Sequence, residues 1–203
     1  MNNRGQLIVL SGPSGCGKGT ILKEMLRTEE KIRLSISLTT RSPRPGEVDG
    51  IDYFYVSKEQ FEQMVRDGAV LEHAEYCENY YGTPRSNVEN WRAEGYHVIL
   101  EIEPQGAFQI KKNCPDATMI FILPPSLEEL ERRLTERGTE DAATVQKRLS
   151  AAAEEIRQSL DYDYIVVNDV LDTAVEEVRT VIHAQKNSSD SMRQTVLDVL
   201  GER

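Results

Sequence analysis

The chain has 203 residues, of which 39% are hydrophobic and 29% charged, and its formal net charge is −10. This length suits one domain with a substantial core, and the composition is ordinary for a globular enzyme in solution. The negative charge argues against broad nucleic-acid binding, but not against a local basic pocket. No apolar run approaches the length of a membrane span.

Cysteine usage and the N-terminal sequence bear on the compartment. The three cysteines, Cys16, Cys77 and Cys114, lack metal-ligand spacing, and their odd number suits reduced thiols in a cytosol. The first residues lead into an apolar run without the pattern of a signal peptide. We therefore expect a cytoplasmic protein that engages neither nucleic acid nor membrane. The oligomeric state is left open, with a homo-oligomer as one option.

The first predicted element is a buried strand, Leu7–Leu10, followed by a loop of the pattern G-x-x-x-x-G-K. Apolar residues then recur at helical spacing from Ile21 to Leu26. Glycines let such a loop fold tightly, so that several backbone N–H groups face one anion, and the helix adds its dipole. The segment therefore predicts a nucleoside triphosphate site, formed by Gly12, Pro13, Ser14, Gly15, Cys16, Gly17, Lys18, Gly19 and Thr20.

Within this loop, Lys18 can reach the outer phosphates as a point charge. The residue after the lysine is usually Ser or Thr, which holds magnesium, but here it is Gly19. A hydroxyl comes one position later, and Thr20 is therefore the candidate metal residue. The structural alternative is an ordinary glycine-rich turn between a strand and a helix.

A second strand is predicted at Leu34–Leu38, and residues 37–86, rich in Tyr, Gly and Pro, predict an inserted lobe. Arg41 and Arg44 flank prolines on a stiff loop, which suits bidentate phosphate binding. Glu72 can accept hydrogen bonds from N1–H and N2–H of guanine, a donor pair that adenine lacks, and Thr83 can donate to O6. Taken singly, these residues also fit a solvated surface or a surface ion pair.

The remaining strands are predicted at Val98–Ile102, Met119–Leu123 and Tyr164–Val167. Between the last two, residues 127–156 are strongly charged and helical, as in a mobile lid. Ser126 and Glu129 form a capping-box pattern for its first helix, which should end near Gly138. A second lid helix is expected from about 141 to 160.

Another helix is predicted to start at Thr173 and Glu176. The tail begins with Asn-Ser-Ser-Asp-Ser, which predicts a flexible segment before a docked helix that carries Val196, Leu197, Val199 and Leu200. Strands that alternate with helices predict an α/β fold with an open, mostly parallel sheet, whose ligands bind beyond the carboxyl ends of the strands.

With these pieces in order, the chain from Gln6 to about Gln185 resembles the guanylate kinase family of nucleoside monophosphate kinases. The resemblance is carried by Ser11–Gly15, Thr39–Glu47, Asn79–Gly82 and Arg137–Glu140. It implies a P-loop NTP hydrolase-like parallel core with an inserted GMP-binding lobe and a helical lid. It also implies transfer of a phosphoryl group from ATP to GMP, and to dGMP, with Mg²⁺, in purine nucleotide metabolism and GMP recycling.

The resemblance divides one guanylate-kinase-like domain, 1–203, into a core (1–36, 87–126 and 157–186), a GMP-binding lobe (37–86), a lid (127–156) and a C-terminal tail (187–203). It implies four catalytic residues, Lys18, Arg41, Arg137 and Arg148. The substrate-binding residues that it implies are Ser37, Arg41, Arg44, Tyr53, Glu72, Tyr81, Gly82, Thr83, Glu101 and Glu103. Adenine is expected near Asn168, and Arg133 is a further lid candidate. Magnesium would be reached by Thr20, Glu101 or Glu103, directly or through water.

Three positions depart from the family pattern. Thr83 stands where the family often has Ser, and the hydroxyl is kept. Glu103 stands where Asp is common, so its longer arm can reposition a carboxylate expected near the guanine amino group and the metal. Gly19 follows the lysine, a variant familiar among monophosphate kinases.

Three other functions remain as alternatives. The main one is a guanylate-kinase-like module that binds phosphorylated peptides without turnover. Such modules typically lose phosphate-loop or lid residues, whereas this chain has Gly12, Gly17, Lys18, Arg137 and Arg148. A kinase for AMP or a modified nucleotide is a second alternative, although Glu72 and the Arg41/Arg44 loop speak against AMP. A regulatory GTPase fits poorly, because there is no Asn-Lys-x-Asp motif.

Overall fold

The computed structural model describes residues 4–76, 78–136 and 142–202. Its central sheet is parallel throughout, in the order β2-β7-β1-β8-β9. The strands are β1 (Leu7–Ser11), β2 (Ile32–Leu34), β7 (His97–Glu101), β8 (Thr118–Leu123) and β9 (Tyr164–Val167). The predicted α/β class with a parallel core is confirmed.

Both faces of the central strand β1 are buried, which fixes the start of the glycine-rich loop. Ile8 and Leu10 pack in one cluster with residues of α1 (Lys18–Thr28) and α7 (Leu171–Gln185). Leu7 and Val9 pack on the other face with residues of α3 (Arg85–Ala93) and α4 (Pro104–Asn113). Burial of each such side chain stabilises the fold by about 1.5 to 3 kcal/mol, so Ser11 ends on a rigid support.

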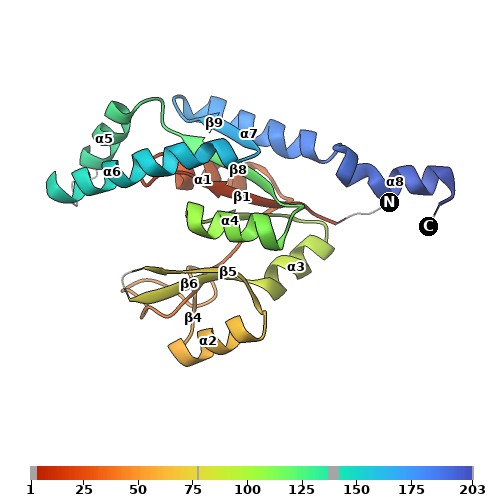
Figure 1. Cartoon of the computed structure of the whole chain (residues 1–203), viewed down its shortest axis with the longest axis horizontal. Helices are drawn as coiled ribbons and strands as arrows, with labels where there is room; N and C mark the ends of the chain where they lie inside the picture. The colour runs from red at the N-terminus through yellow and green to blue at the C-terminus, as the bar shows by residue number, and fades with distance from the viewer. Residues whose placement is uncertain (1–3, 77, 137–141, 203) are drawn as a thin grey trace.

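A second sheet, in the order β4-β3-β6-β5, lies on the α4 side of the central sheet (Figure 1). It consists of β3 (Leu38–Thr39), β4 (Phe54–Tyr55), β5 (Val70–Tyr76) and β6 (Asn79–Pro84), with α2 (Lys58–Arg66) packed against it. Phe61 of α2 is buried and stacks on Tyr80, with 5.5 Å between ring centroids. Gln109 of α4 exchanges two hydrogen bonds with the backbone of His73, which ties this sheet to the core.

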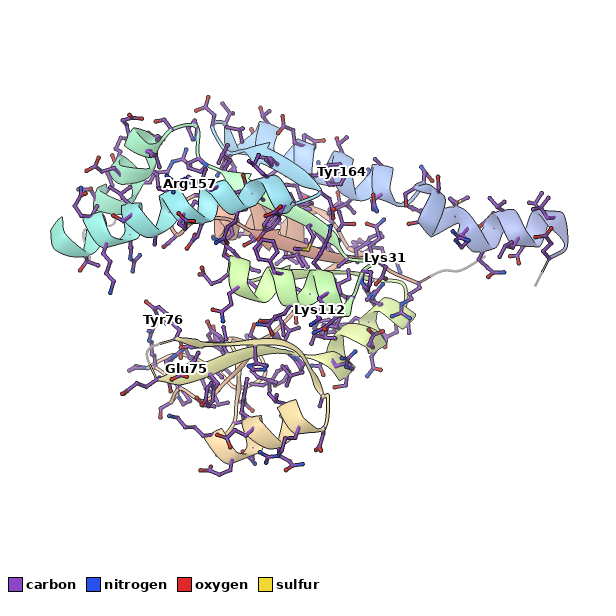
Figure 2. All side chains as sticks on the ribbon, viewed as in Figure 1. Lys31, Glu75, Tyr76, Lys112, Arg157 and Tyr164 are labelled. Atoms are coloured by element: carbon purple, nitrogen blue, oxygen red, sulfur yellow. The ribbon has the colours of Figure 1, made fainter. Side chains whose placement is uncertain are left out.

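Two charged helices, α5 (Leu127–Glu136) and α6 (Ala142–Gln158), form a layer of their own. Leu130 and Leu134 of α5 pack against Val145 and Ala152 of α6. The expected cap is present, since Ser126 Oγ accepts a hydrogen bond from the N–H of Glu129. In Figure 2, Arg157 marks the end of α6, and Glu75 and Tyr76 mark the end of β5, on opposite sides of α4 in this view. The predicted stop at Gly138 lies outside the described residues.

The prediction of a single strand at Leu34–Leu38 is wrong. β2 ends at Leu34, and β3 begins at Leu38 in the other sheet. The N–H of Ser35 still donates to Ile99 O in the core, whereas Ser37 O already accepts from Phe54 in the second sheet. The apolar run is therefore a crossing between two sheets, which periodicity cannot distinguish from one strand.

Two predictions near the C-terminus are also corrected. α7 begins at Leu171, before Thr173, and its N-cap residue Val170 offers no side-chain cap. The tail helix α8 (Ser189–Leu200) forms, but it is not docked: Val196 is 54% and Val199 82% exposed. Figure 1 shows α8 extending beyond the sheet, and the hydrophobic clusters formed by the described residues include no residue of α8. Among the described residues, no helix is long and apolar enough to cross a bilayer.

Candidate active site

The glycine-rich loop is held open by backbone conformations that only glycine adopts easily. Gly12, Gly15 and Gly17 all have positive φ, and Gly17 is the N-cap of α1. A Cβ at Gly12 would lie 2.4 Å from Ile122 O, and one at Gly17 would lie 2.2 Å from Asn168 Nδ2. The loop therefore passes against β8 and Asn168 with no room for a side chain, and it places the N-terminus of α1 beyond the end of β1.

Lys18 is folded back onto the loop that it follows. Its Nζ donates to Gly12 O at 2.5 Å and to Pro13 O at 3.2 Å. Backbone carbonyls thus take the place that phosphate oxygens would occupy around an ammonium group. Cys16 lies fully buried beneath it, and burial raises the pKa of this thiol, which suits a packing residue rather than a nucleophile.

A pocket of about 400 Å³ opens beside the loop, a volume suited to a nucleotide base and sugar. Arg133 lines this pocket. Its Nη2 donates a hydrogen bond to Asn168 O, and its Nε donates one to Glu129 Oε1. Asn168 Nδ2 in turn donates to Cys16 O at 2.8 Å. The pocket is lined by Gly15, Gly17, Thr20, Arg133, Glu136, Asn168, Asp169 and Leu171.

Helices α5 and α6 contact the loop through Leu134, Arg133 and Arg148, and Arg133 Nη1 donates to Cys16 O at 3.4 Å. The side chain of Leu134 lies so close to Gly15 that a Cβ there would be 2.9 Å from it. Arg148 Nη1 donates to Ser14 Oγ at 3.2 Å, which brings one lid arginine to the loop. The other lid arginine implied by the resemblance, Arg137, lies outside the described residues.

The predicted second phosphate site contains a dense ionic contact. Both terminal nitrogens of Arg41 donate to the carboxylate of Glu47, each at 2.9 Å. These hydrogen bonds lower the pKa of Glu47 to about 2 and raise the pKa of Arg41. Arg44 differs: its side chain is exposed, and its backbone N–H donates to Glu47.

Two tyrosine rings pack beside the ion pair of Arg41 and Glu47. The Arg41 guanidinium lies 5.4 Å from the centroid of the Tyr53 ring, and Tyr53 meets Tyr81 edge to face. Burial raises the pKa of Tyr53, so its hydroxyl remains a neutral donor. Ser37 stands on the crossing segment between the sheets, where its carbonyl accepts from Phe54.

The predicted base-recognition residues are also brought together. Thr83 Oγ1 donates to Glu72 Oε1 at 2.7 Å, and both side chains are buried. Burial raises the pKa of Glu72. Gly82 is buried beside them, and a Cβ at Gly106 of α4 would lie 2.5 Å from Glu72 Oε2. The carboxyl thus sits in a narrow slot between the lobe and the core.

Three further carboxyl groups, those of Glu101, Glu103 and Glu155, are electrostatically connected, since the charges of Glu103 and Lys18 act on both Glu101 and Glu155. Glu101, at the end of β7, is exposed when the whole residue is considered. The atoms packed around its carboxyl group nevertheless desolvate that group and raise its pKa. Glu103 is the exposed N-cap residue of α4. Glu155 of α6 has a pKa raised to about 7, by burial first and then by the charge of Glu103. Among the described residues, no cluster of three or more His, Cys, Asp or Glu side chains could hold a metal ion.

Sequence reasoning missed two residues of this region. Glu47 was part of a motif without a role of its own, although an acid that closely follows two arginines, Arg41 and Arg44, is placed to pair with one of them. Glu155 gave no signal in the sequence, because it is one of many charges on a charged helix and only the fold buries it.

Comparison with known proteins places these features in a family. The family model described as guanylate kinase matches residues 4–185. A guanylate kinase of Clostridioides difficile (strain 630) is 48% identical over 199 residues, which cover 98% of this chain and 97% of that protein. One of Latilactobacillus sakei subsp. sakei (strain 23K) is 52% identical over 186 residues, covering 91% and 92%.

A solved structure agrees over the same length. The crystal structure of guanylate kinase from Anaplasma phagocytophilum matches with a TM-score of 0.75 and 34% sequence identity. The match covers 96% of this chain and 94% of that one. The likeness therefore extends over nearly the whole of both chains.

Proposed function

This chain belongs to the guanylate kinase family, and we propose that it transfers the γ-phosphoryl group of ATP to GMP, giving ADP and GDP. The observation that carries the choice of acceptor is the buried pair of Glu72 and Thr83. A carboxylate accepts from N1–H and N2–H of guanine, and a hydroxyl donates to O6, a pattern that adenine cannot match.

We infer the following roles for the donor side. The loop amides from Gly15 to Thr20 hold the β-phosphate, and Lys18 leaves the Gly12 and Pro13 carbonyls to bridge the outer phosphates. The pocket beside Asn168 takes the adenine. Hard oxygen donors suit Mg²⁺, which usually takes few protein ligands beside phosphate oxygens, so Thr20, Glu101 and Glu103 fit as its residues. Bound there, the ion would neutralise charge on the outer phosphates.

For the acceptor, Ser37, Tyr53 and Tyr81 join Arg41 and Arg44 around the GMP phosphate and base. The acceptor phosphate is already an anionic nucleophile, so no general base is needed, and catalysis rests on alignment and charge neutralisation. Arg148, already at Ser14, and Arg137 supply positive charge to the transferring group when the lid closes, and closure excludes water.

The finer proposals concern setting and range. We propose that dGMP is also accepted, that the reaction serves purine nucleotide metabolism and GMP recycling in the cytoplasm, and that the protein binds no nucleic acid or membrane. A homo-oligomer remains an option. The division into core, lobe, lid and tail is likewise a proposal. The alternative of a phosphopeptide-binding module is not favoured, because the loop glycines, Lys18 and Arg148 are all in place.

The test is a coupled assay of ADP release from ATP–Mg²⁺, with GMP, dGMP, AMP, CMP and UMP offered separately. We expect strong stimulation by GMP and dGMP alone. A folded protein that binds GMP but shows no stimulation by any acceptor would instead support the phosphopeptide-binding module.

A further inference from the structure

The carboxylate of Glu47 accepts four hydrogen bonds, although its neighbours in the loop are mostly exposed. Its carboxylate accepts from Nη1 and Nη2 of Arg41, from the backbone N–H of Arg44 at 2.7 Å and from the Tyr55 hydroxyl at 2.8 Å. The side chains of Arg41 and Glu47 are only 15% and 19% exposed. Such a shielded, bidentate contact is of the strong kind, unlike a solvated surface ion pair.

The contact leaves a defined part of Arg41 available. A guanidinium carries five N–H donors in a rigid plane. Glu47 takes one from each terminal nitrogen, and Ser42 O takes the second on Nη1 at 2.8 Å. The donors that these bonds do not use are Nε–H and one N–H of Nη2, which form one edge of the plane. The Tyr81 hydroxyl interacts with the same guanidinium, and the Tyr53 ring lies beside it.

We propose that Glu47 is a positioning residue for the acceptor phosphate: it holds Arg41 so that the edge bearing Nε–H stays presented beside Tyr81, and it fixes the turn at Arg44. The inference rests on the proposed function and adds to it a residue that does not touch the substrate. Without Glu47, Arg41 would keep its charge but lose its fixed orientation, and binding would have to order a long side chain.

The ionisation of Glu47 supports this role. With a pKa of about 2, it stays charged across the range in which an enzyme is assayed. Tyr55, whose hydroxyl donates to it, has a pKa raised to about 12 by burial and by this carboxylate, and so remains a donor. The clamp of Arg41, Glu47 and Tyr55 therefore keeps one protonation state.

The first experiment measures binding without ATP, so that it does not depend on turnover. Affinities for GMP and for guanosine, which lacks the phosphate, are compared in wild type, Glu47→Ala and Glu47→Gln. We expect GMP to bind about 10- to 100-fold more weakly in both variants, with guanosine changed less than about threefold. Glu62→Gln is the matched control, because Glu62 is an exposed carboxylate of the same lobe near Arg66, and it should match wild type.

The outcomes separate three readings. Equal losses for GMP and guanosine would overturn the inference, since Glu47 would then only stabilise the lobe. Unchanged or tighter GMP binding would also overturn it, since Glu47 would then be a spectator or a competitor for Arg41. A wild type that binds neither ligand would count against the proposed function itself.

A double-mutant cycle tests whether Glu47 acts through Arg41. We expect Glu47→Ala to weaken GMP binding in wild type but to have little further effect in Arg41→Ala. Tyr55→Phe, which removes one donor to Glu47, should shift GMP affinity in the same direction by less than about tenfold. Additive losses in the cycle would show that Glu47 does not work through Arg41 and would overturn the proposal.

Discussion

In the proposed function the glycine-rich loop and the inserted lobe each bind a phosphate, but they would do so with different parts of the chain. The loop uses backbone: three glycines with positive φ and the N-terminus of α1, resting on a strand buried on both faces. The lobe uses side chains: Arg41, Glu47 and Tyr55, carried on short strands and turns.

The difference explains where each region is vulnerable. A phosphate site formed by backbone N–H groups needs no ordering of long side chains, but an added Cβ at a closely packed glycine such as Gly12 or Gly17 would clash. A side-chain clamp tolerates changes in nearby volume, but it must fix long, charged side chains with counter-charges. We therefore expect added side-chain volume at the closely packed glycines to damage the loop. In the lobe, we expect damage from the loss of a single charged or hydrogen-bonding atom.

The largest effect is expected from the one side chain on which the loop depends. Lys18→Ala should lower kcat by at least about 10³-fold, because it removes the charge that bridges the donor phosphates. Stability should change by no more than about 1 kcal/mol, since the lost hydrogen bonds are to loop carbonyls. The coupled assay and thermal melting measure both. Lys23→Ala, an exposed lysine of α1, is the control, and turnover near that of wild type in Lys18→Ala would exclude the role.

The second prediction tests the steric sensitivity of the loop. Gly17→Ala should destabilise the fold by about 3 kcal/mol and abolish ATP binding. The new Cβ would clash with Asn168, and the alanine backbone would have to adopt a left-handed conformation. Gly19→Ala is the matched control, since a Cβ there meets nothing within 4 Å and the residue is helical. That substitution should stabilise by about 0.5 to 1 kcal/mol. Similar melting temperatures for the two variants would contradict the backbone account.

The third prediction changes one atom of the lobe. Glu72→Gln should weaken GMP binding by about 10- to 100-fold and leave ATP binding unchanged, because the amide has a single acceptor oxygen and turns its NH2 donor toward the other guanine donor. The preference for GMP over inosine monophosphate, which lacks the 2-amino group, should shrink. Calorimetric titration of each nucleotide measures these changes, and parallel losses for ATP and GMP would indicate general damage instead.

The same substitution should stabilise the substrate-free protein. The pKa of Glu72 is raised above its unfolded value by burial, so its contribution is favourable at low pH and is lost as pH rises through the folded-state pKa. At neutral pH the carboxyl therefore costs stability that Gln avoids. A higher melting temperature with weaker GMP binding would show that the lobe gives up stability for recognition.

The sequence predicted the loop and most of the core because their signals are local. The strand, the glycines and Lys18 are contiguous, and the buried strands are short apolar runs of the kind found in parallel sheets that are covered on both faces. The run from Leu34 to Leu38 was misassigned because its two halves join different sheets, a tertiary fact. The tail helix was predicted from its apolar spacing, but spacing does not say whether a partner surface exists.

The lobe and its neighbours were less accessible to sequence reasoning. The Glu47 clamp draws its donors from Arg41, Arg44 and Tyr55, which approach one another only when β4 pairs with β3. The environment of Glu155 likewise exists only after α6 packs over the core. Side-chain constellations of this kind depend on three-dimensional contacts, whereas a backbone cradle is written in adjacent residues.

The smallest predicted effect concerns Glu155, which lies between the two regions. Its carboxyl is influenced by Glu103, which we propose lies near Mg²⁺, and by Lys18 of the loop, and its charge in turn helps to raise the pKa of the buried Tyr162. Its Oε2 is buried without a hydrogen-bond partner among the described residues. Its pKa is raised from 4.5 to about 7, so its favourable contribution to stability is complete below about pH 4.5 and is lost as pH rises through 7.

Glu155→Gln keeps the shape and removes the titration. Relative to this variant, the wild type should lose about 1 to 2 kcal/mol of unfolding free energy between pH 5 and 8, after allowance for solvent screening. Urea unfolding at several pH values measures the difference, and Glu154→Gln, an exposed neighbour on α6, should follow the wild type. If wild type, Glu155→Gln and Glu154→Gln show the same dependence of unfolding free energy on pH, the Glu155 carboxyl is solvated and α6 does not hold it near Glu103. If only Glu155→Gln lacks this additional loss of stability, the packing of α6 is linked to a proton, unlike the backbone of the glycine-rich loop.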